Sequence, residues 1–172
     1  MDFNDILVDA FGRIRDAVHG AVDGGSPATL AYRPDADANS IAWLVWHLTR
    51  IQDDHVADVA GTEQVWITED WVARFGLPFT PADHGYGHTT EQVAALGGTT
   101  AELLLGYHDA VHDATVHYLR GLTRTDLDRI VDERWDPPVS LAVRLVSVVA
   151  DNLEHAGQAA YVRGLAQRSG VG

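Results

Sequence analysis

The chain has 172 residues, of which 46% are apolar, a formal net charge of −13 and no cysteine. This length is typical of one domain with a substantial buried core, so we expect a single domain over residues 1–172. The lack of cysteine excludes disulfides, thiolate metal ligands and a cysteine nucleophile. The acidic charge disfavours nucleic acid as a partner, because phosphate binding needs a positive patch and the twelve basic residues, all arginine, are scattered.

The sequence also indicates where the protein resides. No uninterrupted apolar run reaches the roughly 18 to 20 residues that cross a bilayer. The first ten residues, MDFNDILVDA, are acidic where a secretion signal would be basic. We therefore expect no membrane span and no targeting segment, and a cytoplasmic location.

Two stretches in the first third of the chain have the apolar spacing of amphipathic helices. The first runs from about Phe3 to Val22, with Asp2 as its N-cap. The second runs from about Ser40 to Ala60, with Asn39 as its cap and Gly61 as its stop. Both are long enough to contribute a face to one core.

Two further long helices are predicted in the second half. The third begins at a capping box, Thr99-x-x-Glu102, and ends near Gly121. The fourth has Ser140 as its cap and runs to about Gln167. Its predicted apolar stripe consists of Leu141, Leu145, Val148, Val149, Leu153, Ala156 and Ala160. Between these helices, the Asp126-Leu-Asp segment predicts a short helical turn, followed by an extended stretch.

The connection between the second and third helices is unusual, because about 38 residues is far longer than the handful that join antiparallel neighbours in a bundle. A long crossover lets these two helices run parallel. We therefore predict an all-α fold, a four-helix bundle with a long crossover between helices two and three. The crossover is rich in aromatic residues and has its own helix signal, Thr89-x-x-Gln92. It fits an Ω-like cover or a substrate-binding lid equally well, with His84 and His88 as lid or surface residues.

Nine histidines are the main chemical signal in this chain. At about 100° per residue, His47 and Asp54 fall on a polar ridge of the second helix, and Arg144, Asp151 and His155 fall on a similar ridge of the last. If the ridges face each other, they form a mixed nitrogen and oxygen site for a divalent metal. Asp151 and His155 share one face at i, i+4, and His47 would be the third ligand. The same spacing is common in surface pairs, so metal-free, solvent-facing ridges are the alternative.

Other histidines have plainer explanations. His108 and His112 are also spaced i, i+4, on the third helix, where such a pair can bind metal. They lie on or beside its apolar stripe, which favours core or groove histidines. His55 lies on the stripe of the second helix and is either a core histidine or faces a cavity.

Two segments resemble a known superfamily. Asn39-Ser-Ile-Ala-Trp-Leu-Val-Trp-His-Leu-Thr-Arg resembles the second helix of DinB/YfiT-like proteins. Asp151-Asn-Leu-Glu-His-Ala-Gly-Gln resembles their last helix, whose usual pattern is His-x-x-x-His-x-Gly-Gln. The resemblance covers essentially the whole chain. This superfamily includes mycothiol- and bacillithiol-dependent transferases and the N-terminal domains of maleylpyruvate isomerases.

The resemblance implies a metal-binding four-helix bundle whose three ligands fall on His47, Asp151 and His155. Asp151 stands where the superfamily usually has a second histidine. Two histidines and one carboxylate suit zinc, which we expect, or nickel or iron. The same replacement also fits a site that has lost its metal.

Three more residues are placed near the metal by this scheme. Asp54 is interpreted as an acceptor that fixes the tautomer of His47, with a fourth ligand as the alternative. Arg144 is placed to meet an anionic group on the thiol or the substrate. Gln158 is expected to hydrogen-bond near the metal.

The resemblance implies an enzyme in which the metal holds an external thiol, of the mycothiol type, as a thiolate that attacks a small electrophile. The missing cysteine agrees with this, as does a composition typical of a high-GC genome. One alternative is a metal-dependent hydrolase. Another is a non-enzymatic small-ligand-binding or stress-response bundle with a degenerate metal site. A homodimer is compatible with each of these hypotheses.

Overall fold

The computed structural model describes residues 2–171 and is mostly helical, with one small two-stranded sheet. The four predicted long helices are present, with ends close to the predicted ones. They are α1 (Phe3–Val22), α3 (Ile41–Ala60), α7 (Ala101–Gly121) and α8 (Leu141–Arg168). The shorter elements are α2 (Pro27–Ala31), α4 (Val65–Thr68), α5 (Trp71–Phe75), α6 (Thr90–Ala94), η1 (Ala95–Gly98), η2 (Arg124–Asp128), β1 (Ile130–Asp132) and β2 (Val139–Ser140).

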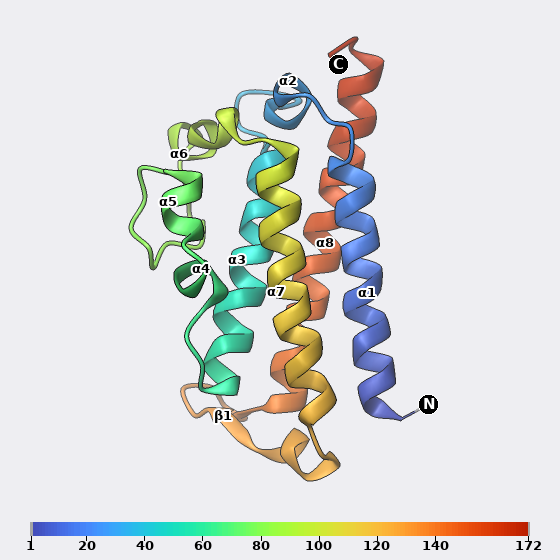
Figure 1. The fold of residues 1–172 in the computed structure, drawn as a ribbon, viewed down its shortest axis with the longest axis vertical. Helices are drawn as coiled ribbons and strands as arrows, with labels where there is room; N and C mark the ends of the chain where they lie inside the picture. The colour runs from blue at the N-terminus through green and yellow to red at the C-terminus, as the bar shows by residue number, and fades with distance from the viewer. Residues whose placement is uncertain (1, 172) are drawn as a thin grey trace.

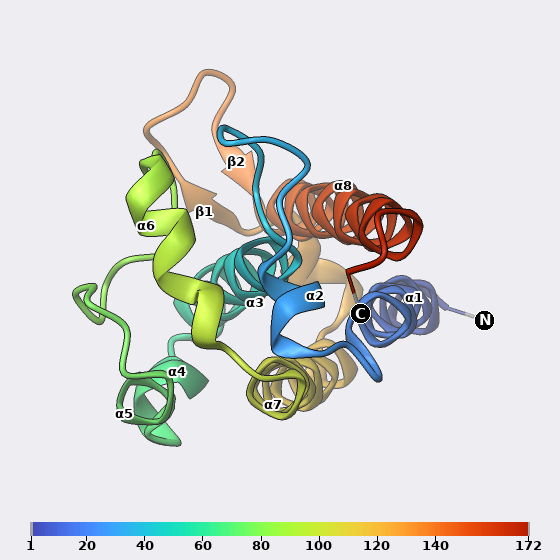
Figure 2. The same ribbon diagram turned by 90° about the horizontal axis from the view of Figure 1, so that it is seen from above.

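The four long helices lie side by side (Figure 1). Helices α3 and α7 run in the same direction, and α1 and α8 run in the opposite one, so the long crossover does join two parallel helices as predicted. Seen from above in Figure 2, α3 packs against α7 and α8, and α1 packs against the same two helices. The antiparallel pair α3 and α8 therefore forms one continuous seam, and this seam carries the candidate site.

The caps of two helices differ from the prediction by one residue. The second long helix is capped by Ser40, whose hydroxyl accepts a bond from the Trp43 N–H at 3.2 Å, and not by Asn39. The third is capped by Thr100, whose hydroxyl accepts from the Leu103 N–H at 3.3 Å. In both cases an adjacent residue with a suitable side chain has the extended backbone that a cap requires. The expected caps Asp2 and Ser140 are confirmed, as is the stop at Gly61 and the capping box that opens α6 at Thr89.

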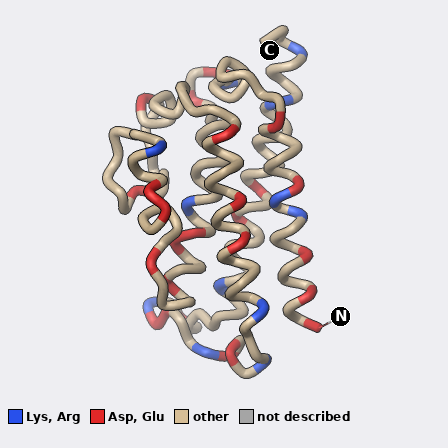
Figure 3. Tube along the Cα trace, in the orientation of Figure 1, with Lys and Arg blue, Asp and Glu red and all other residues tan. Residues whose placement is uncertain are grey.

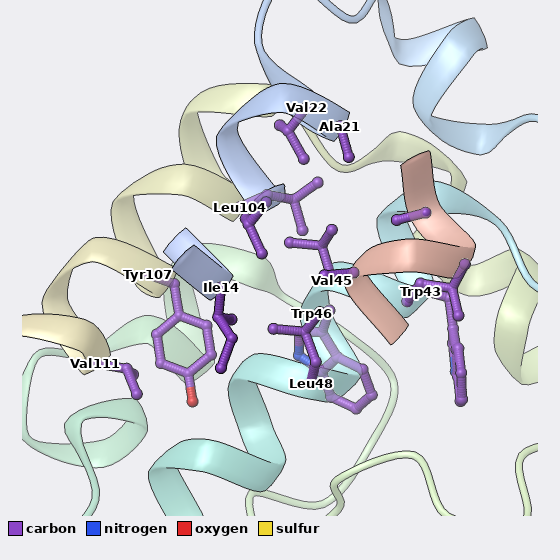
Figure 4. Close-up of a cluster of buried hydrophobic side chains, with 14 of the residues drawn as sticks. Ile14, Ala21, Val22, Trp43, Val45, Trp46, Leu48, Leu104, Tyr107 and Val111 are labelled. Carbon is purple, nitrogen blue, oxygen red and sulfur yellow. The ribbon is translucent and has the colours of Figure 1, made fainter. Parts of the chain in front are cut away.

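The core is formed by apolar side chains from all four long helices, together with aromatic residues of the crossover. Figure 4 shows Ile14 of α1, Leu48 of α3 and Val111 of α7 within one cluster, with Trp43 on a different side of α3 from Tyr107. Trp43 therefore belongs to the seam with α8, where the candidate site lies.

The predicted apolar stripe of the last helix is partly wrong. Leu153 is 44% exposed, whereas Asn152 beside it is fully buried. The burial of Asn152 is possible because its Nδ2 donates to Gln52 Oε1 at 2.7 Å, and Gln52 Nε2 donates to the Thr115 hydroxyl at 2.8 Å. This buried chain of hydrogen bonds connects α8 to α3 and α7. The core face of α8 therefore includes Asn152, a polar residue that the apolar spacing does not mark as buried.

The predicted extended stretch after η2 pairs with itself. Strands β1 and β2 form an antiparallel hairpin in which Ile130 faces Ser140, just before α8 begins. Acidic positions are spread along the long helices and the crossover (Figure 3). Within residues 2–171, none of the helices combines the length and apolar character that a bilayer crossing requires.

Candidate metal centre

Three side chains predicted as metal ligands meet in the seam between α3 and α8. His47 comes from α3, and Asp151 and His155 come from one face of α8, and one ligand atom of each lies within 4.8 Å of the others. The rings of His47 and His155 are edge to face, with centroids 4.9 Å apart. Separations of this size place two nitrogens and one carboxylate oxygen around a common point, which is the donor set of a zinc, iron or nickel site.

The hydrogen bonds around these residues leave the donor atoms free for a metal. His47 Nδ1 donates to the carbonyl oxygen of His84 at 2.5 Å, and His155 Nδ1 donates to Gln158 Oε1 at 2.9 Å. Each imidazole therefore keeps its lone pair on Nε2, the tautomer that an orienting acceptor imposes on a ligand histidine. Asp151 Oδ2 is buried and has no hydrogen-bond partner among residues 2–171. A buried, unpartnered carboxylate oxygen beside two Nε2 lone pairs fits a divalent cation.

Burial lowers the pKa of His47, although the bond to the His84 carbonyl opposes the shift. The side chain is therefore held neutral at pH 7, the form in which imidazole binds a metal.

An aromatic wall closes one side of the centre. The Trp43 ring stacks on His47 with centroids 4.7 Å apart, and its Nε1–H donates to His88 Nδ1 at 3.0 Å. His88 in turn donates from Nε2 to Asp83 at 3.0 Å. This chain connects α3 to the crossover, so the crossover is part of the site and not a distant cover.

The structure gives His84 and His88 closer roles than the sequence indicated. Both were expected to be lid or surface residues, yet the side chain of His88 is only 3% exposed and the backbone of His84 contacts a candidate ligand. A backbone carbonyl has no signature in the sequence. The only signal was the glycine that follows His84, which marks a sharp local conformation.

Gly85 lets the crossover backbone approach His47. Its φ is +95°, and a Cβ there would lie 2.9 Å from His47 Nδ1 and about as close to two tryptophan rings. Any larger residue would push away the loop that carries the His84 carbonyl. The glycine is therefore required both by its backbone conformation and by the space.

We expect Gly85→Ala to weaken zinc binding by about 10- to 100-fold, because it displaces the acceptor that orients His47. Gly87→Ala is the matched control, since Gly87 also has a positive φ, +73°, but a Cβ there would meet nothing within 4 Å. Competition with a chromophoric zinc chelator measures both affinities. Equal losses in the two variants would show that backbone strain, and not the orientation of His47, is responsible.

Of the other residues predicted near the metal, Asp54 and Arg144 lie further along the seam. Asp54 accepts a bond from Gln64 Nε2 at 2.7 Å, and the structure gives the role of orienting His47 to the backbone of His84. Arg144 donates to His55 Nδ1 at 2.9 Å and to Asp132 at 3.0 Å. Gln158 contacts His155 as described above. The sequence allowed His55 to be either a core histidine or one that faces a cavity, and the structure places it in the lining of a polar cavity.

The second histidine pair is buried in the core, as its position on the apolar stripe favoured. His108 is fully buried and His112 is 9% exposed, between α7 and α1. Within residues 2–171, the candidate ligand trio at the seam is the only group of three or more His, Asp or Glu side chains that gathers this closely. Both ring nitrogens of His108 lack a hydrogen-bond partner among the described residues.

Comparison with known proteins identifies the family. A family model described as Mycothiol-S-transferase matches residues 6–167, nearly the whole chain. The chain belongs to the Mycothiol-S-transferase family. The resemblance to DinB/YfiT-like proteins is thereby confirmed.

One solved structure supports the fold of this Mycothiol-S-transferase family member. The crystal structure of a conserved protein from Enterococcus faecalis is 27% identical in sequence and superposes with a TM-score of 0.88. The match covers 95% of this chain and 96% of that one. A search of curated proteins gave no match. Because both chains are covered almost end to end, the long crossover and the seam belong to the shared fold.

Proposed function

We propose that this protein is a metal-dependent transferase that uses an external thiol of the mycothiol type to attack a small electrophile. The observation that carries the proposal is the trio His47, Asp151 and His155, with free Nε2 lone pairs and an unpartnered carboxylate oxygen. The family match supports the class of reaction. The close packing of the four long helices supports the four-helix bundle of DinB/YfiT-like proteins as the frame.

The metal would be held by His47 from one helix and by Asp151 and His155 from the other. Zinc suits this donor set best, and nickel or iron also bind two histidines and a carboxylate. When bound, the ion supplies the positive charge that favours the thiolate form of a thiol at neutral pH.

The residues around His47, Asp151 and His155 have different roles. The His84 carbonyl and Gln158 fix the two imidazoles, so that both lone pairs point to one place. Trp43 covers one face of His47 and excludes water from it. The chain itself has no cysteine, so the nucleophilic sulfur has to come from a separate molecule.

The first test measures bound metal in the protein purified without a histidine tag. We expect about one equivalent of zinc, nickel or iron by elemental mass spectrometry in the parent, and almost none in a His47→Ala/His155→Ala double variant. His117→Ala, an exposed histidine of α7, is the control and should leave the metal content unchanged. A parent that takes up no divalent metal, even after incubation with each ion, would overturn the mechanism.

Position 151 gives a sharper version of the same test. Asp151→Ala removes one ligand, whereas Asp151→His supplies the residue that the superfamily usually has there. We expect the alanine variant to lose metal and the histidine variant to keep it. If Asp151→Ala binds metal as tightly as the parent, Asp151 is not a ligand.

A further inference from the structure

A groove of about 840 Å³ lies between α3 and α7, beside the ends of both helices. Its floor is apolar, because it includes the buried side chains of Val56 and Val59 from α3 and of Val111 from α7. Ala60 and Ala114 also line the groove, and side chains of this size leave the space between the helices unfilled. A groove of this volume with mostly apolar walls is typical of a small-molecule site.

Aromatic residues of the crossover cover the same pair of helices closer to their middle. Trp66, Trp71 and Phe75 surround Tyr107 of α7, with ring centroids 5.0 to 5.9 Å from its own. The groove begins where this cover ends, at Val65. Beyond Val65 the described residues, 2–171, leave the space between α3 and α7 open, and an apolar floor without a cover is suited to an apolar ligand.

Two carboxylates lie in the lining of the groove. Glu63 is exposed at its rim. Asp126 accepts from the N–H and the hydroxyl of Thr123, both on Oδ2, so Oδ1 has no hydrogen-bond partner among residues 2–171. Helices α3 and α7 also run in the same direction and both end beside the groove (Figure 1). The negative ends of two helix dipoles therefore add to the charge of these carboxylates.

The guanidinium of the lining is already engaged. Arg129 Nη2 donates to the Val59 carbonyl at 2.8 Å and to the Tyr118 hydroxyl at 3.2 Å. Because this carbonyl belongs to the last turn of α3, Arg129 offsets the dipole of that helix. One guanidinium against two carboxylates leaves the rim with a negative charge, which attracts an ammonium group and repels an anion.

A third carboxylate, Asp53, adds little to the charge that a ligand meets. It accepts from the N–H groups of Val65 and Trp66, and its Oδ2 lies 3.7 Å from Arg50 Nη1. Its negative charge is therefore offset inside the protein, beneath the groove.

We propose that this groove binds a small apolar amine, a molecule with a hydrocarbon body and one protonated amino group. The body lies on Val56, Val59 and Val111, and the ammonium group meets Glu63 and Asp126. An alkylamine is charged at pH 7, because its pKa is close to that of lysine.

This site is separate from the candidate metal centre. At 100° per residue, Val56 and Ala60 lie roughly 140 to 180° around the axis of α3 from His47. The groove is therefore on the opposite face of α3, and its ligand does not depend on a bound metal.

Three ligands that share one ring system test the chemical class. These are 2-naphthylmethylamine, 2-naphthylmethanol and 2-naphthoate, which carry a positive, a neutral and a negative group. By isothermal titration calorimetry we expect the amine to bind about five- to tenfold more tightly than the alcohol, and the carboxylate to bind most weakly. Equal affinities for the amine and the alcohol, tightest binding of the carboxylate, or no binding of the amine at about 1 mM, would overturn the proposal.

A variant that fills the groove locates the binding. Ala114 is exposed on α7, so Ala114→Trp places an indole in the groove without disturbing the core, and we expect it to weaken amine binding more than about tenfold. Ala150→Trp, at an exposed alanine of α8, is the matched control. Circular dichroism verifies that both variants fold. Unchanged amine affinity in Ala114→Trp would place the ligand elsewhere and overturn the assignment.

Removing the two carboxylates tests the origin of the preference. Glu63→Gln/Asp126→Asn should bring the affinity for the amine down to that for the alcohol, while the affinity for the alcohol stays unchanged. Glu102→Gln, at an exposed position in the first turn of α7, is the control. If the double variant still prefers the amine, the ammonium group does not meet these carboxylates and the proposal is wrong.

The His47→Ala/His155→Ala variant separates this site from the metal centre. It should bind 2-naphthylmethylamine with the affinity of the parent, because the groove lies on the other face of α3. Loss of binding in this variant would place the amine at the candidate metal centre and overturn the proposal.

Discussion

Replacing Asp53 with alanine is expected to lower the free energy of unfolding by about 3 to 5 kcal/mol, the range observed when one partner of a buried ion pair is removed. Asp53 is 3% exposed, in the middle of α3. Its carboxylate accepts from the N–H groups of Val65 and Trp66 at 2.9 and 2.8 Å, and from the Tyr107 hydroxyl at 2.8 Å. Alanine would leave these three buried donors without a hydrogen-bond acceptor, and that unfavourable burial lowers the stability of the variant.

Arg50 makes this loss larger. Its guanidinium is fully buried, with Nη1 3.7 Å from Asp53 Oδ2, and it lies over the Trp66 ring at 5.0 Å. Without Asp53 the cation remains buried with only neutral partners. Burial raises the pKa of Asp53 despite its bonds, so the pair itself adds little, and an uncompensated Arg50 dominates the expected loss.

Urea unfolding followed by tryptophan fluorescence and by circular dichroism measures the change. Asp9→Ala is the control, since Asp9 forms an exposed pair with Arg13 on α1, and we expect it to change stability by less than about 1 kcal/mol. An Asp53→Ala variant as stable as the Asp9→Ala control would show that the buried network does not hold the crossover.

The same network explains how the crossover reaches the candidate metal centre. Arg50 donates from Nε to the Asp83 carbonyl and from Nη2 to the Pro81 carbonyl, both at 3.2 Å. These are the residues just before His84, whose own carbonyl orients His47. Stability and site geometry therefore depend on one set of contacts, so loosening the crossover should also weaken metal binding.

The long helices could be predicted from the sequence because their signals are local. Apolar spacing depends on neighbours three and four residues away, and it gave all four long helices with their ends close to the observed ones. Asp151 and His155 share a face for the same reason. Pairing them with His47 needed the resemblance to DinB/YfiT-like proteins, because no local rule says which ridge of α3 faces α8.

Contacts between distant residues, and contacts made by the backbone, could not be predicted. Asn152 meets Gln52 across 100 residues of sequence, and a buried asparagine violates the apolar spacing that defined the stripe. Arg50 and Asp53 look like surface residues, since arginine and aspartate are rarely buried unless they are paired. The His84 carbonyl is a backbone atom. The contacts of Arg50, Asp53 and the His84 carbonyl set how the crossover meets α3, so the candidate ligands could be named from the sequence but their surroundings could not.

The protein is expected to lose stability in acid because of His108. Burial lowers the pKa of His108 to about 3, from an ordinary value of 6.5. Above pH 6.5 this histidine is neutral in both the folded and the unfolded chain. As the pH falls below 6.5, the unfolded chain takes up a proton that the folded protein excludes, so stability falls by about 1.4 kcal/mol per pH unit until about pH 3.

His108→Leu should remove this loss and also stabilise the protein at pH 7. Both ring nitrogens are buried without a hydrogen-bond partner among residues 2–171, and an apolar side chain of similar size removes that unfavourable burial, by about 1 to 3 kcal/mol. His117→Leu, at an exposed position on the same helix, is the control and should change neither the stability nor its pH dependence.

The measurement is urea unfolding of the parent and both variants at intervals from about pH 7.5 to about pH 4. This range begins above the ordinary pKa of His108 and extends toward its lowered value in the folded protein. His112, Asp109, His19 and Arg15 surround His108, and they are unchanged in the variant, so the difference between the two curves isolates the one proton. The gap between His108→Leu and the parent should widen steadily as the pH falls. A constant gap would mean that His108 is protonated in the folded protein as easily as in the unfolded chain, through a partner such as buried water. In that case the interface between α7 and α1 is polar and hydrated, and the acid sensitivity has to come from other groups, among them Asp83 and Asp109, whose pKa values are lowered in the folded protein by their hydrogen bonds.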